Sequence, residues 1–105
     1  MLTSKTKKDA AHPYTRISKK TRAAFKKRCQ KLGLNCADAI RQLVASYLDH
    51  PFKIHPRVRG EALDTATDAA RDTQANVLAI RKVAEAYGVS HSEVLRQLID
   101  KYLES

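Results

Sequence analysis

The sequence predicts a mostly α-helical fold with one short β-strand near its N-terminus. Apolar residues recur at three- and four-residue spacing through most of the chain, which is typical of amphipathic helices. The segment 12–18 differs, because it gathers the β-forming residues Tyr14, Thr15 and Ile17. Glycine and proline stand between the periodic segments, where they end helices. We therefore expect helices joined by short turns and preceded by a single strand.

The N-terminal end is predicted to be a basic arm followed by the strand. Residues 1–11 are small, polar and rich in lysine, so we expect a flexible segment. Lys5, Lys7 and Lys8 precede the strand and are candidates for phosphate contacts, the alternative being a solvated tail. A strand within 12–18 is too short to be stable alone. We therefore expect it to pair with its own copy in a second subunit.

Two helices are predicted to follow the strand. Ser18 is a good N-cap for the first helix, which ends at Gly33, and Asn35 is a good N-cap for the second. Residues 50–60 contain prolines and a glycine, so we expect a linker there. Residues 61–105 are predicted to be a second, all-helical unit that extends the core or joins subunits.

A shift of 55 positions superposes the two halves of the chain. Gly33 then meets Gly88, and residues 40–44 meet the similar residues 95–99. The shared glycine and the shared Arg-Gln-Leu favour a duplication over chance similarity between amphipathic helices. Residues 67–73, opposite the predicted strand, lack strand character. The second copy is therefore predicted to keep the helix pair and to have lost the strand.

Charge is divided unevenly between the two halves. Residues 1–60 carry fifteen basic and three acidic side chains, and residues 61–105 carry five basic and eight acidic ones, for a net charge of +9. A basic half of this kind indicates a polyanionic partner. It lacks the bulky apolar face that would insert into lipid, so nucleic acid is favoured over a membrane surface.

Motifs for catalysis are absent from the sequence. It has no glycine-rich phosphate loop, paired-carboxylate motif or metal-ligand cluster, so we expect no enzyme, no cofactor and no metal. Cys29 and Cys36 are interpreted as small apolar residues rather than as a disulfide or a zinc site. No apolar run suits a membrane span or a signal peptide, so we expect a cytoplasmic protein of bacterial type, associated with nucleoid or plasmid DNA.

The order of segments within residues 12–49 leads to a family resemblance. Residues 14–18 read Tyr-Thr-Arg-Ile-Ser, and a four-turn helix, Gly-Leu-Asn at 33–35 and a helix ending in Tyr-Leu at 47–48 follow. This order resembles the ribbon-helix-helix family of small DNA-binding repressors. The resemblance implies that 12–49 is the DNA-binding module of a homodimer or higher homo-oligomer. Paired strands from two subunits would enter the major groove of double-stranded DNA as a ribbon.

Alternation along the strand divides its side chains between two faces. Pro13, Thr15 and Ile17 are expected to face the helices, which leaves His12, Tyr14 and Arg16 on the outer face. Arg16 is the best candidate for reading a guanine, because its guanidinium fork matches the O6 and N7 acceptors. Tyr14 and His12 can each add one less informative hydrogen bond to a base.

Phosphate contacts are expected where both helices of this module begin. Basic side chains at the start of the first helix would face the DNA backbone, or they would form an ordinary solvated face. The resemblance implies that backbone N–H groups at the start of the second helix bind a phosphate, which the helix dipole favours. The candidates are Lys19, Lys20, Arg22, Asn35, Cys36 and Ala37.

Sequence-specific DNA binding of this kind is expected of a transcriptional repressor, or of a plasmid accessory protein in partition or in the conjugation relaxosome. Two alternatives stay open. Residues 76–104 have the spacing of a helix-turn-helix with 89–93 opening a recognition helix, although Glu85, Glu93 and Asp100 would repel phosphate. The second alternative is an antitoxin or adaptor that binds a protein partner through the acidic C-terminal half.

Overall fold

The chain repeats one order of elements twice. The computed structural model describes residues 10–56, 63, 65–67 and 69–104, and within them each copy has two short strands followed by two helices. The first copy contains β1 (Ala10–Ala11), β2 (Arg16–Ile17), α1 (Lys19–Lys31) and α2 (Cys36–Asp49). The second contains β3 (Thr65–Ala66), β4 (Arg71–Asp72), α3 (Gln74–Tyr87) and α4 (His91–Glu104). Each element of the second copy begins 55 positions after its counterpart. The mostly helical fold is thus confirmed, and the repeat covers strands as well as helices.

The strands of the two copies pair with each other inside the chain. β1 is antiparallel to β4, and β2 is antiparallel to β3. Between these pairs the N–H of His12 donates to the carbonyl of Ala70 (2.8 Å), and the N–H of Thr67 donates to the carbonyl of Thr15 (2.9 Å). The shift of 55 positions converts one hydrogen bond into the other. The two segments therefore form one antiparallel ribbon with an approximate two-fold axis at its centre.

Two expectations about the strands are wrong. Residues 61–73, where the structure describes them, contain β3 and β4 rather than a helix, so the second copy has kept its strand segment. In addition, β2 pairs with β3 of the same chain and not with a second subunit. The duplication explains both differences, because it places the partner strand on the same polypeptide. Cross-strand pairing then imposes strand conformation on residues such as Ala66 and Asp72, which rarely occur in strands.

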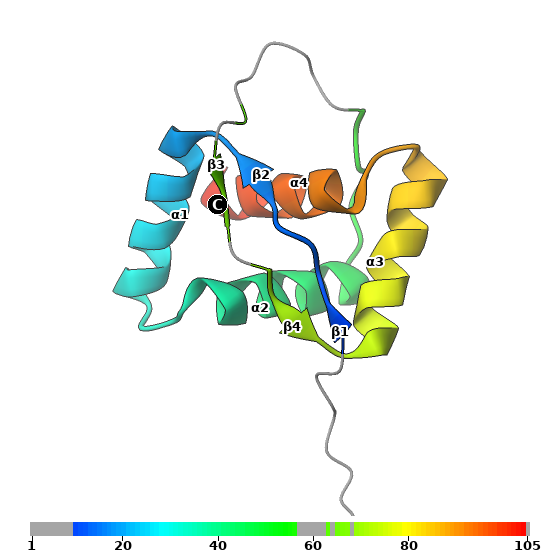
Figure 1. The fold of residues 1–105 in the computed structure, drawn as a ribbon, viewed down its shortest axis with the longest axis horizontal. Helices are drawn as coiled ribbons and strands as arrows, with labels where there is room; N and C mark the ends of the chain where they lie inside the picture. The colour runs from blue at the N-terminus through cyan, green and yellow to red at the C-terminus, as the bar shows by residue number, and fades with distance from the viewer. Residues whose placement is uncertain (1–9, 57–62, 64, 68, 105) are drawn as a thin grey trace, which may run out of the picture.

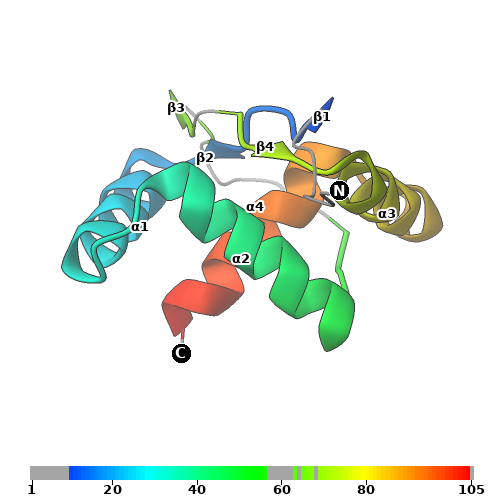
Figure 2. The ribbon, with the colours of Figure 1, turned by 90° about the horizontal axis from the view of Figure 1, so that it is seen from below.

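One hydrophobic core lies beneath the ribbon. Figure 1 shows the strands in front of the helices, and Figure 2 shows α2 and α4 crossing beneath them with α1 and α3 at the two sides. Ile54, between the copies, is 1% exposed and belongs to the same core, so the expected linker packs in part. The two copies share this core, whose largest buried helical side chains include Phe25, Val44, Ile80, Val94, Leu95 and Ile99.

The predicted helix boundaries of the first copy are confirmed. The side chains of Ser18 and Asn35 each accept a hydrogen bond from the backbone N–H three residues later, at 3.1 and 2.7 Å. Gly33 and Gly88 have φ angles of 72° and 68°, in the left-handed region that glycine adopts without a steric cost. These caps and stops place the starts of α2 and α4 directly against the ribbon.

Candidate nucleic-acid interface

The outer face of the ribbon carries two equivalent arginines. Arg16 in β2 and Arg71 in β4 are related by the shift of 55 positions, and both are exposed. Tyr14, between β1 and β2, is 63% exposed. The ribbon forms one face of the molecule, with the helices behind it (Figure 2). Tyr14 and Arg16 therefore lie where the sequence predicted, whereas Arg71 was missed because no strand was expected around it.

His12 does not belong to this outer face, and its expected position there is wrong. The residue is 0% exposed. The expected inward position of Pro13 is wrong as well: Pro13 and Tyr14, at the centre of the ribbon, are both exposed, so the alternation of faces slips by one residue there. Proline has no N–H to donate to the ladder, which suits it to such an interruption. The slip turns His12 toward the helices, where it is not placed to contact a base.

The buried His12 joins the ribbon to the start of α4. Its Nε2 atom lies 3.0 Å from Oδ2 of Asp72, and its Nδ1 atom lies 2.9 Å from Nε2 of His91. Burial, followed by the proximity of His12 and of Arg81, lowers the pKa of His91 to about 4. His91 is therefore neutral at pH 7. The three side chains form a fixed link between β1, β4 and α4.

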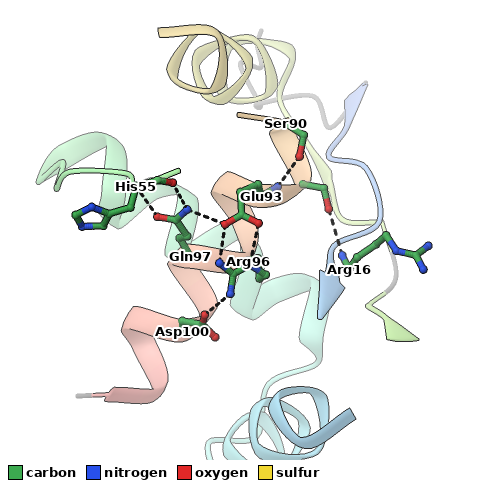
Figure 3. A network of polar contacts seen from close by, with 8 residues as sticks. Arg16, His55, Ser90, Glu93, Arg96, Gln97 and Asp100 are labelled. Atoms are coloured by element: carbon green, nitrogen blue, oxygen red, sulfur yellow. Dashed lines mark hydrogen bonds and ion pairs between the residues drawn. The ribbon is translucent and has the colours of Figure 1, made fainter. Parts of the chain in front are cut away.

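Polar contacts hold each arginine strand against a helix. The hydroxyl of Ser92 donates to the carbonyl of Tyr14 (2.9 Å), and the N–H of Arg16 donates to the same hydroxyl (3.2 Å). Across the ribbon, Nη1 of Arg41 donates to the carbonyl of Arg71 (3.0 Å). Figure 3 shows the guanidinium of Arg16 pointing away from the polar side chains of α4. There its Nη2 atom donates to the carbonyl of Leu63 (3.3 Å). The helices thus set the positions of both strands, and the guanidinium of Arg16 lies on the side away from α4.

The first turns of α1 form a basic surface beside the end of the ribbon. Lys19 and Lys20 begin the helix directly after β2 and its cap, and both are exposed, as is Arg22. The whole of α1 carries seven basic and no acidic residues. We call Lys19, Lys20, Arg22 and Lys26 the basic cluster. The predicted flexible arm is wrong at its last two residues, because Ala10 and Ala11 form β1 and pair with β4. Its lysines Lys5, Lys7 and Lys8 lie outside the described residues.

The basic cluster borders the start of α2. A small cavity of about 40 Å³ is lined by Arg22, Phe25, Lys26, Cys36 and Thr67. Thr67 is 4% exposed, and its hydroxyl has no hydrogen-bond partner among the described residues. Asn35 caps the helix with its side chain, and Ala37 is half-buried. Positive side chains and a helix N-terminus around an unsatisfied hydroxyl form a suitable environment for an anion.

A second cluster of polar side chains lies on α4 and has a structural role. Glu93 is 6% exposed, and its carboxylate accepts two hydrogen bonds from Arg96, at 2.8 and 2.6 Å. Arg96 also donates to Asp100 (2.7 Å). The side-chain amide of Gln97 donates to the carbonyl of His55 (2.7 Å) and accepts from its N–H (2.9 Å), as Figure 3 shows. This cluster fastens the segment between the copies onto α4.

Comparison of the chain with protein-family models, with curated proteins and with solved structures finds no match. Within the described residues, no group of three or more His, Cys, Asp and Glu side chains is placed to hold a metal ion. No helix in that part of the chain is long and apolar enough to cross a membrane. Among the described residues, the ribbon and the basic cluster are the features that bear on function.

Proposed function

We propose that the chain is a single-chain ribbon-helix-helix protein that binds double-stranded DNA by placing its internal ribbon in the major groove. The observation that carries the proposal is the antiparallel ribbon with Arg16 and Arg71 exposed at equivalent positions. A two-stranded ribbon fits the major groove, and an arginine fork pairs with the O6 and N7 atoms of guanine. One chain would supply the two strands that the resembling family takes from two subunits.

The basic cluster supports the proposal because it is placed to contact the DNA backbone. A ribbon lying in the major groove has phosphates at both ends, and Lys19 and Lys20 directly follow β2 and its cap. The start of α2 lies next to Arg22 and adds the positive end of its helix dipole. Phosphate contacts of this kind fix the register of a protein on the duplex, which leaves sequence reading to Tyr14 and the two arginines.

The two alternatives find less support. A helix-turn-helix would place the first turns of α4 in the groove, but Glu93, Val94 and Leu95 are 6%, 0% and 1% exposed. An antitoxin or adaptor needs a free C-terminal half, whereas Leu98 and Ile99 pack into the shared core. We propose the role of a transcriptional repressor or of a plasmid accessory protein, with several chains arranged on repeated sites.

A salt-dependent titration on a random duplex library tests the proposal. The variants are Arg16→Ala and Arg71→Ala, with Lys101→Ala as a control, because Lys101 is exposed near the C-terminal end of α4, away from the ribbon (Figure 2). We expect the wild type to select a sequence with a log–log salt slope of about −6 to −9, which corresponds to roughly 7–10 neutralised phosphates.

Each ribbon variant should lose about 1–3 kcal/mol of discrimination at one base position. The salt slope should change little, because selectivity depends on base contacts and the slope depends on phosphate contacts. Lys101→Ala should keep both properties. The proposal is wrong if the wild type selects no sequence, or if both arginine variants keep its selectivity.

A further inference from the structure

We propose that the two halves of the ribbon bind DNA unequally, so that the protein recognises a non-palindromic site in one fixed orientation. The inference rests on the proposed DNA binding. Two identical subunits bind identical DNA half-sites, which is why the sites of symmetric dimers are palindromic. A duplicated chain is free of this constraint, because each pair of equivalent positions holds two independent residues.

The helices that follow the two halves of the ribbon differ in charge. Three basic positions of α1 have uncharged counterparts in α3, at the same distance from the ribbon. The pairs are Lys19 and Gln74, Lys20 and Ala75, and Arg22 and Val77. The side chain of Val77 is also buried in the core, where it is 4% exposed. The first turn of α1 therefore offers three cations to the phosphate backbone where the first turn of α3 offers none, and only the fourth member of the basic cluster, Lys26, has a basic counterpart, the exposed Arg81.

The environment at the start of α2 is also not repeated at the start of α4. Cys36 and Thr67, which line the small cavity beside Arg22, correspond to His91 and His12. The two imidazoles contact each other with ring centroids 5.1 Å apart, and His12 is bonded to Asp72. Two imidazoles that are hydrogen-bonded to each other and backed by the Asp72 carboxylate are a poorer environment for an anion than a helix start flanked by Arg22 and Lys26.

The reading face is unequal as well. Both halves keep an arginine, but Tyr14 is 63% exposed in the first half, and its counterpart in the second is the half-buried Ala69. One half-site is read by an arginine and a tyrosine, and the other by an arginine alone. Together with the charge difference, this places most phosphate contacts and most base contacts on the half-site nearest α1.

A pair of mirrored variants tests the inference. Lys19→Gln/Lys20→Ala gives α1 the residues of α3, and Gln74→Lys/Ala75→Lys gives α3 the residues of α1. All four positions are exposed, so the melting temperatures should stay near that of the wild type. The measurement is phosphate-ethylation interference on the sequence that the wild type selects from a random duplex library, together with the salt slope.

For the wild type we expect interfering phosphates mainly on one side of the site's centre, and a selected sequence that is not a palindrome. The first double variant should lose these phosphates and reduce the slope by about 2. The second should add phosphates on the opposite side and steepen the slope by about 2. A palindromic site with symmetric interference would overturn the unequal binding and leave the proposed function standing. Failure to select any sequence would overturn both.

Discussion

Asp72 meets the buried His12 at 3.0 Å, although the two residues are 60 positions apart in the sequence. The carboxylate is 6% exposed, and its other oxygen accepts hydrogen bonds from the N–H of Thr73 (2.7 Å) and from Nδ2 of Asn76 (3.1 Å). One side chain thus joins β1 to β4 and orders the start of α3. A carboxylate buried to this degree is tolerated because each of its oxygens has a hydrogen-bonding partner.

Replacing this carboxylate is expected to be costly. Asp72→Ala removes one member of a buried pair and leaves His12, Asn76 and a backbone N–H without their acceptor, so the free energy of unfolding should fall by about 3–5 kcal/mol. Urea denaturation measures the change. The chain provides a matched control in Asp49 and His50, which also lie 3.0 Å apart but are 76% and 83% exposed. Asp49→Ala should cost less than about 1 kcal/mol. Equal losses for the two variants would contradict the structural role of Asp72.

Stability should also depend on pH through His91. Its pKa lies near 4 in the folded protein against 6.5 in an exposed histidine, mainly because of burial. The unfolded chain therefore takes up the proton first, so stability falls as the pH drops from 6.5 toward 4 and levels off below 4. Because His91 is partly exposed, we expect a loss of roughly 1–3 kcal/mol.

The measurement is urea denaturation at a series of pH values beside His91→Gln, whose amide can still form a hydrogen bond with His12 but does not titrate. The difference in unfolding free energy between the two proteins should change over this pH range. A constant difference would show that His91 is not responsible.

Local signals in the sequence are sufficient to predict the helices but not the ribbon. Ser18, Asn35 and the two glycines mark helix ends by their own chemistry, so α1 and α2 could be placed correctly. The strand conformation of residues 65–66 and 71–72 depends instead on backbone partners in the N-terminal segment. No propensity of alanine or aspartate indicates it, which is why a strand was predicted in the first copy only.

The candidate site was predictable to the same extent. Simple alternation placed Tyr14 and Arg16 on the outer face correctly. The slip beside Pro13 puts His12 on the inner face instead of the predicted outer face. Arg71 was within reach of sequence reasoning, because the repeat of 55 positions aligns it with Arg16. The contact of Ser92 with the Tyr14 carbonyl depends on the crossing of α4 under the ribbon, which no local pattern indicates.

The attachment of the segment between the copies can be tested at Gln97. Its amide exchanges two hydrogen bonds with the backbone of His55, whereas the equivalent residue of α2, Gln42, is exposed. Gln97→Ala should lower the cost of opening this segment by about 1–2 kcal/mol, so that trypsin cleaves after the exposed Lys53 roughly 5–30 times faster. Gln42→Ala is the control and should be cleaved at the wild-type rate. Equal rates for the two variants would show that the contact does not hold the segment.

The two thiols should report separately on folding and on DNA. Cys29 is 1% exposed, and burial, with smaller effects of the neighbouring Cys36, raises its pKa to about 11. Because the thiolate is the reactive form, iodoacetamide should alkylate the half-buried Cys36 first and reach Cys29 only when the protein unfolds. Cys36 also lines the cavity beside Arg22, where we place a phosphate, so the selected duplex should slow its alkylation.

Mass spectrometry of the alkylated peptides distinguishes the two sites, and an unselected duplex at high salt serves as the control. Protection of Cys36 by the selected duplex alone would place the start of α2 against the DNA backbone. If the duplex binds but Cys36 reacts at the unprotected rate, the phosphate lies elsewhere. The basic cluster would then attract the DNA electrostatically at long range, without binding a phosphate at the start of α2.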